Sequence, residues 1–208
     1  MIKAVIFDVD GVLLDSFEAN LEFFQNLMRH TGYPPPTRES FSKQFHFSMW
    51  DAIKAMTGLE DDEKVKRVFE KGESADFPYS TDSIVMPEGA GEVIEILSGL
   101  YALGIVTSRL KANIFETPEL AALKSCFKAD VGFEDTEKHK PDPEPLILAT
   151  RYLGVKPEEC VYVGDLATDV EAAHAAGMNA IVYSKEAIES ADAQTADFKK
   201  IPELIKSL

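Results

Sequence analysis

Residues 3–11 have the sequence Lys3-Ala4-Val5-Ile6-Phe7-Asp8-Val9-Asp10-Gly11, an apolar run that ends at two acids. A short run of β-favouring residues that stops at a polar loop is typical of a buried parallel strand. Similar runs follow at residues 102–106, 160–163 and 179–183. Helical patterns cover residues 88–100, 143–153 and 168–176. Because strands alternate with helices, we predict an α/β fold with a doubly wound parallel sheet.

One long segment departs from this alternation. From about residue 16 to about residue 83, apolar residues follow helical spacing, as in Phe17, Leu21 and Phe24, and no strand pattern is strong. Glycine-containing breaks divide the segment near Gly32 and Gly58. We therefore predict a Rossmann-like core of residues 1–15 and 84–208, with an inserted all-helical domain of residues 16–83.

The composition excludes several classes of protein. The chain has 208 residues and a formal net charge of −15, so its long-range field opposes nucleic acids and anionic membranes. Two cysteines provide neither a disulfide framework nor a zinc cluster. No apolar run approaches the roughly 20 residues that span a bilayer. We expect a cytoplasmic protein with no nucleic-acid or membrane partner.

Reactive side chains follow the predicted strands at their carboxyl ends, where ligands bind in open α/β sheets. They are Asp8 and Asp10, then Thr107, then Asp165, and a loop carries Lys140. Carboxylates that lie close together need a cation, and Mg²⁺ prefers oxygen ligands. The hydroxyl and the ammonium group suit a phosphate, and a carboxylate can attack phosphorus. This set favours Mg²⁺-dependent phosphoryl chemistry.

Four segments resemble, in order, the four motifs of the haloacid dehalogenase-like hydrolase superfamily. They are Asp8-Val9-Asp10-Gly11-Val12, Thr107, Lys140-Pro141-Asp142-Pro143 and Gly164-Asp165-Leu166-Ala167-Thr168-Asp169. The resemblance covers nearly the whole chain, and the predicted insert is similar to that family's helical cap. It implies hydrolysis of a small phosphorylated substrate, a phosphomonoester, through an aspartyl-phosphate.

The resemblance also implies roles for single residues. Asp8 would be the nucleophile, and Asp10 would be the general acid and then the general base. Thr107 and Lys140 would bind phosphoryl oxygens, with Ser108 as a further candidate.

The implied cofactor is Mg²⁺. Its ligands would be Asp8, Asp165 and the backbone carbonyl of Asp10, and Asp169 would be either another ligand or a group that supports the ligands.

Details of the motifs leave alternatives open. The pattern Gly-Asp-x-x-x-Asp at residues 164–169 resembles the phosphoglycolate phosphatase-like branch, which we favour, whereas Gly11-Val12 is frequent in β-phosphoglucomutase-like proteins. A sugar phosphomutase is therefore the second hypothesis. Hypotheses from another class are a phospho-accepting signalling module and a protein that only binds phosphorylated ligands.

Some residues outside the motifs are also of interest. In the insert, Gln44, His46 and Trp50 are our candidates for substrate specificity, because residues of a lid select substrates. Arg109 could reach a phosphate, but we favour a solvated or helix-start residue. The sequence is compatible with a monomer or a homodimer.

Overall fold

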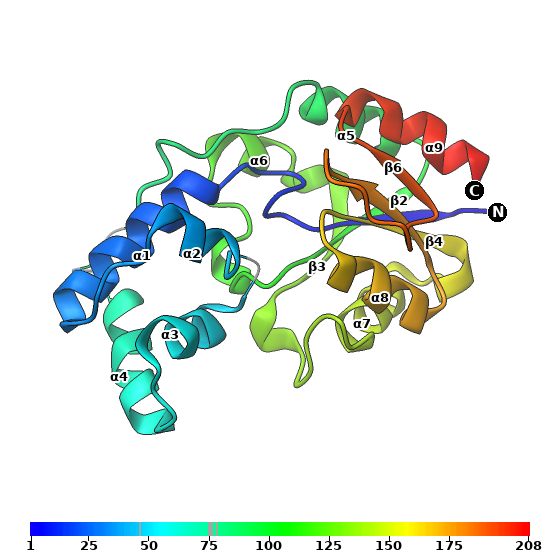
Figure 1. Cartoon of the computed structure of the whole chain (residues 1–208). Helices are drawn as coiled ribbons and strands as arrows, with labels where there is room; N and C mark the ends of the chain where they lie inside the picture. Colours follow the sequence, from blue (N-terminus) through cyan, green and yellow to red (C-terminus); the bar gives the residue numbers. More distant parts are fainter. Residues whose placement is uncertain (46, 75–76, 78) are drawn as a thin grey trace. The chain divides into compact units, whose positions relative to one another are not determined.

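The core of the protein is a six-stranded parallel sheet. The structure is a computed structural model, and it describes residues 1–45, 47–74, 77 and 79–208. Its order is β3-β2-β1-β4-β5-β6, and every neighbouring pair is parallel. The strands are β1 (Ala4–Phe7), β2 (Ala102–Val106), β3 (Phe127–Val131), β4 (Cys160–Gly164), β5 (Asn179–Tyr183) and β6 (Ala193–Thr195). This sheet, flanked by helices (Figure 1), confirms the predicted fold class.

Helices cover both faces of the sheet. On one face lie α5 (Ala90–Ser98) and α9 (Ile201–Ser207), and on the other lie α7 (Glu144–Leu153) and α8 (Ala167–Ala176) (Figure 1). The side chains of β1 alternate between the faces: Ile6 joins the cluster under α7 and α8, whereas Phe7 stacks on Phe198. Burial on both sides explains why β1 is apolar throughout.

Shorter helical segments connect these elements. They are α6 (Pro118–Ala122) and the 3₁₀ turns Lys111–Asn113, Lys124–Cys126, Phe133–Asp135, Pro157–Glu159 and Phe198–Lys200.

Two strands were not predicted from the sequence, and both are edge strands. β3 carries Lys128 and Asp130 between its apolar residues, and all three residues of β6 are only half-buried. Edge strands have one unpaired side and tolerate charged or polar residues, so they lack the continuous apolar run of a central strand.

The chain divides into two compact units, which we call the core unit (Met1–Asp15 with Val85–Leu208) and the helical unit (Ser16–Ile84). The predicted division differs from this one only in assigning Ile84 to the core. The helical unit contains α1 (Phe17–Thr31), α2 (Arg38–Ser42), α3 (Met49–Thr57) and α4 (Asp62–Gly72).

The sequence explains where these helices begin and end. The Thr37 and Ser48 side chains cap the first turns of α2 and α3, and Asp61 caps α4. Gly32 ends α1 in the left-handed conformation. The apolar faces meet in one cluster around Leu27, Met28, Phe41, Ile53 and Val65, so the unit has a hydrophobic core of its own.

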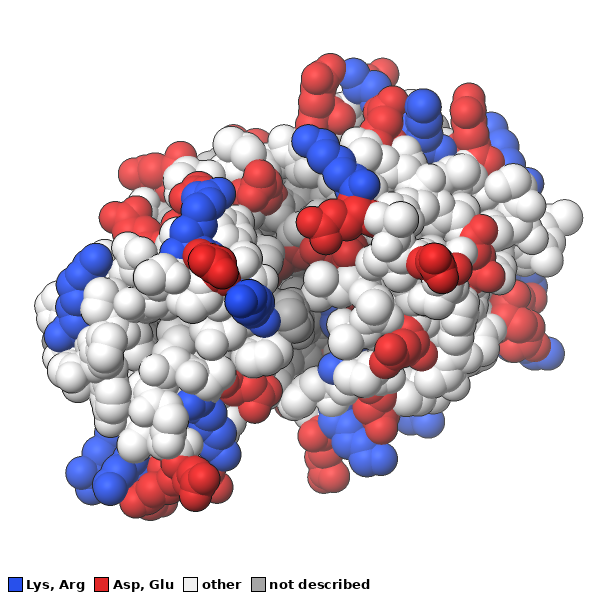
Figure 2. All heavy atoms as spheres, viewed as in Figure 1, with Lys and Arg blue, Asp and Glu red and all other residues white. Residues whose placement is uncertain are grey.

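Acidic and basic side chains are interspersed over the face drawn in Figure 2, with the acids in excess over the whole chain. Among the residues described, no helix has the length and apolar character needed to cross a bilayer.

Candidate active site

The candidate site lies at the point where the order of the strands reverses. β1 and β4 are neighbours at the centre of the sheet, and their connections run to opposite sides. Asp8 directly follows β1, and Asp165 directly follows β4. In open α/β sheets the crevice beyond such a switch point is where ligands bind. The topology therefore brings together two acids that are separated by most of the chain.

Lys140 joins the acidic groups. Its Nζ donates to Asp8 Oδ2 at 2.7 Å, to Asp169 Oδ1 at 2.7 Å and to the Tyr162 hydroxyl at 2.9 Å. The Lys140 side chain is 9 % exposed, so these are buried, charge-assisted contacts. The loop that carries Lys140 thus reaches the edge of the sheet at which Asp8 lies.

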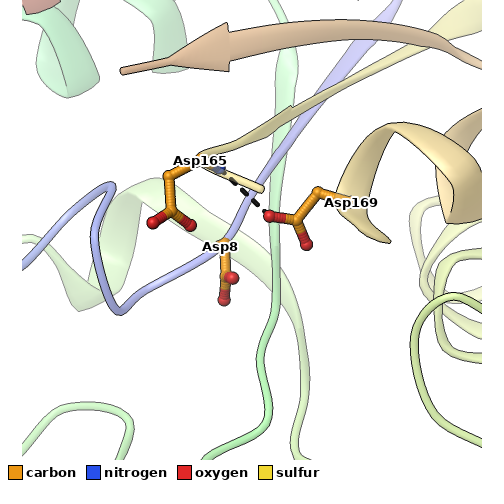
Figure 3. A group of neighbouring side chains, drawn as sticks. All are labelled: Asp8, Asp165 and Asp169. Atoms are coloured by element: carbon orange, nitrogen blue, oxygen red, sulfur yellow. Dashed lines mark hydrogen bonds between the residues drawn. The ribbon is translucent and has the colours of Figure 1, made fainter. Parts of the chain in front are cut away.

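Asp169 organises the loop after β4. Its Oδ2 accepts the backbone N–H groups of Asp165 and Leu166 at 3.0 and 3.1 Å, and its Oδ1 accepts Lys140. Figure 3 shows the carboxylate of Asp169, at the start of α8, joined to the backbone of Asp165. Asp169 accepts three hydrogen bonds from the described residues, and two of them come from the backbone of the loop that carries Asp165. We therefore infer that Asp169 supports the other acids rather than binding a ligand itself.

Burial and mutual repulsion disfavour the charged carboxylates. Burial raises the pKa of Asp8 to about 6, although the positive charge of Lys140 opposes this shift. Burial, and next the negative charges of Asp8 and Asp169, raise the pKa of Asp165 to about 8. Burial lowers the pKa of Lys140, but the charges of Asp169 and Asp8 outweigh it and raise that pKa well above its ordinary value. The ammonium group of Lys140 alone therefore does not offset the negative charge that these carboxylates would carry if all were ionised.

These residues fit a hard divalent cation. Oxygens of Asp8, Asp165 and Asp169 lie within 4.8 Å of one another (Figure 3). Asp165 Oδ1 is buried and has no hydrogen-bond partner among the described residues. A buried oxygen without a partner is costly, and a cation would both satisfy it and offset the charge. Asp8 and Asp165 are the side chains best suited to hold Mg²⁺.

Thr107 lies at the end of β2, beside β1. Its side chain is buried, its backbone N–H donates to Val131 O, and its Oγ1 accepts the backbone N–H of Arg109 at 3.2 Å. Ser108 is the next residue of the same turn and is half-buried. Their predicted roles as phosphate ligands stay predictions.

The interpretation of Arg109 as a solvated residue is wrong. Its side chain is 9 % exposed, and its guanidinium group forms a two-pronged ion pair with Asp10. The sequence does show a basic residue two positions after Thr107, at the end of a central strand, which indicates that Arg109 lies near the site. That signal does not reveal a partner 99 residues away in the sequence.

Tyr162 was not predicted as part of the site. It is fully buried in β4, accepts from Lys140 Nζ and donates to Val106 O at 3.1 Å. A tyrosine in an otherwise apolar strand was the available signal, because a buried hydroxyl needs a partner.

Two of the three specificity candidates lie within the described part of the helical unit. Trp50 packs on Phe69, and Lys54 Nζ lies 5.7 Å from the centre of its ring. Gln44 Oε1 is buried and has no hydrogen-bond partner among the described residues. His46 lies outside the described residues. The predicted role of all three in specificity stays a prediction.

Known proteins are similar to this chain over most of its length. A family model described as haloacid dehalogenase-like hydrolase matches residues 5–183. A pyrophosphatase, PpaX from Bacillus pumilus, is 28 % identical over 211 residues, which cover 98 % of this chain and 95 % of that protein.

Solved structures are also similar. One is a hydrolase of the haloacid dehalogenase superfamily, subfamily IA, variant 1, from Geobacter sulfurreducens PCA. It is 28 % identical with a TM-score of 0.77 and covers 98 % of this chain and 100 % of its own. Another is a candidate β-phosphoglucomutase from Thermotoga maritima, 26 % identical with a TM-score of 0.72 over the whole of both chains. The resemblance inferred from the motifs is therefore confirmed, and this chain belongs to the haloacid dehalogenase-like hydrolase family.

Proposed function

We propose that this protein is a Mg²⁺-dependent phosphatase that hydrolyses a small phosphomonoester through an aspartyl-phosphate on Asp8. The observation that carries the proposal is the position of Asp8. It lies at the switch point of the sheet, 2.7 Å from Lys140 Nζ and beside Asp165. A carboxylate that shares its site with an ammonium group and a candidate metal site suits attack on phosphorus.

The reaction has two steps. In the first, a carboxylate oxygen of Asp8 attacks phosphorus, the bond to the leaving oxygen breaks, and the Asp10 carboxyl gives that oxygen a proton. In the second, water attacks the phosphoryl group, the bond to Asp8 breaks, and Asp10 takes the proton of the water. Free phosphate and a regenerated Asp8 carboxylate result.

The other groups of the site would bind the phosphoryl oxygens and offset their negative charge. Lys140 and Thr107 would bind phosphoryl oxygens and offset the charge that develops in the transition state. Mg²⁺, held by Asp8, Asp165 and the Asp10 carbonyl, would supply further positive charge for the same oxygens. The helical unit would act as a lid that excludes bulk water and selects the substrate.

The test is phosphate release from a panel of phosphoglycolate, sugar phosphates, nucleotides and pyrophosphate, with Mg²⁺ and with chelator. Pyrophosphate belongs in the panel because a relative is named a pyrophosphatase. We expect release that needs Mg²⁺ and that Asp8→Asn abolishes. The matched control is Asp82→Asn, the same chemical change at an exposed position. An Asp8→Asn variant as active as the wild type would refute the proposal.

A sugar phosphomutase is the second candidate. The similarity to a candidate β-phosphoglucomutase supports it, because both activities can use the same phosphorylated aspartate. A mutase would convert a sugar phosphate into its isomer, in the presence of a sugar bisphosphate, faster than it releases phosphate. Product analysis by ³¹P NMR separates the two activities. A protein that only binds phosphorylated ligands would give neither product.

The cytoplasmic location of the protein and its state as a monomer or a homodimer stay predictions.

A further inference from the structure

Arg109 holds the Asp10 carboxylate in a two-pronged contact. Arg109 Nε donates to Asp10 Oδ2 at 2.8 Å, and Arg109 Nη2 donates to Asp10 Oδ1 at 2.8 Å. Parallel contacts of this kind fix the plane of a carboxylate as well as its position. Among ordinary side chains only arginine offers such a planar fork.

Arg109 is in turn held by its own loop. Its Nη1 donates to the carboxylate of Glu116 and to the backbone carbonyl of Asn113 at 3.3 Å. The side chains of Arg109 and Glu116 are largely buried. The guanidinium group therefore lies between two carboxylates, and to bind a phosphate it would have to give up ion pairs that are already formed.

We infer that Arg109 is a positioning residue for Asp10, and that Glu116 keeps Arg109 in place. This inference rests on the proposed function, in which Asp10 gives a proton to the leaving oxygen and takes one from water. Proton transfer requires the carboxyl group to lie within hydrogen-bond reach of both oxygens. Arg109 acts on the reaction through Asp10 and does not contact the phosphoryl group.

This role predicts a distinctive pattern of kinetics. An aliphatic alcohol is a poor leaving group and needs the proton from Asp10, whereas p-nitrophenolate leaves without it. In Arg109→Met, we expect kcat for phosphoglycolate to fall about 100-fold, the effect of a misplacement of about 1 Å. We expect kcat for p-nitrophenyl phosphate to fall less than about 10-fold. KM and the inhibition constant of inorganic phosphate should stay within about twofold of the wild type.

Further variants refine the test. Arg109→Lys keeps the charge but loses the fork, so it should restore only part of the phosphoglycolate rate. Glu116→Gln should give a weaker form of the same pattern. Arg151→Met, at an exposed position in the same unit, is the matched control and should equal the wild type.

Other outcomes would overturn the inference. A phosphate ligand at position 109 would show as a large rise in KM and in the inhibition constant of phosphate. A purely structural role would show as equal losses for both esters together with a lower Tm. A wild type that releases phosphate from no ester of the panel would instead remove the proposed function itself.

Discussion

Gly11 is the residue at which a single methyl group should disturb the candidate metal site most directly. It has a φ of +81°, and a Cβ added there would lie 2.2 Å from Asp165 Oδ2. An ordinary contact needs about 3.4 Å, so in Gly11→Ala the carboxylate of Asp165 must withdraw by about 1.2 Å. The left-handed backbone of alanine adds about 1–2 kcal/mol of strain.

Gly177→Ala is the matched control. Gly177 has the same φ of +81° and lies in the core unit, but nothing lies within 4 Å of an added Cβ. The backbone strain alone should therefore lower the Tm of Gly177→Ala by about 2–8 °C, and Gly11→Ala should lose at least as much stability because of the added overlap with Asp165.

Only Gly11→Ala should lose function. A displacement of about 1 Å in an active site costs about 100-fold in rate, and a disturbed ligand weakens metal affinity by about 10–100-fold. The assay is phosphate release as a function of Mg²⁺ concentration, with thermal denaturation of each variant in parallel. If both variants kept equal activity and equal dependence on Mg²⁺, the close approach of Gly11 to Asp165 would have no functional meaning.

Three further predictions concern the buried charges. Tyr162→Phe removes the hydroxyl that contacts Lys140 Nζ, and we expect the free energy of unfolding, measured in urea, to fall by about 1–3 kcal/mol. Asp169→Asn breaks a buried ion pair with Lys140 and should cost about 3–5 kcal/mol in the same assay; a loss no greater than that of Tyr162→Phe would contradict the supporting role of Asp169. Without a divalent cation, the folded protein favours neutral Asp165, because its pKa is raised from 3.8 to about 8. The stability that this group contributes is complete below about pH 4 and is lost as the pH rises through about 8. In chelator, Tm should therefore fall more steeply between about pH 5 and about pH 8 in the wild type than in Asp165→Asn, and equal slopes would contradict the raised pKa.

The central strands could be predicted from the sequence because their burial requires apolar residues. β1, β2, β4 and β5 are buried between helices on both faces, so their runs were recognisable. β3 and β6 were missed because edge strands can carry Lys128, Asp130 and Gln194. The convergence of Asp8, Asp165 and Lys140 was also predictable, since the carboxyl ends of parallel strands share one edge of the sheet.

Side-chain partners across the sheet could not be predicted. The contact of Arg109 with Asp10 depends on how the 109–116 loop turns its guanidinium group inward, and no local pattern encodes that turn. Tyr162 belongs to an apolar strand, and the pattern of that strand does not reveal that its hydroxyl lies beside Lys140. Likewise, the sequence does not show which of Asp165 and Asp169 binds a metal and which binds the backbone, because this depends on which carboxylate oxygens remain available.

The central claim is that Asp8 carries the phosphoryl group during the reaction. The most direct measurement is acid quenching during turnover with Mg²⁺ and the best substrate of the panel, followed by proteolysis and mass spectrometry. We predict one phosphoryl group on the peptide that contains Asp8, sensitive to hydroxylamine as an acyl phosphate is, and none in Asp8→Asn. Two results together would contradict the account. They are rapid release of phosphate by the wild type with no modification of that peptide, and an Asp8→Asn variant that remains active.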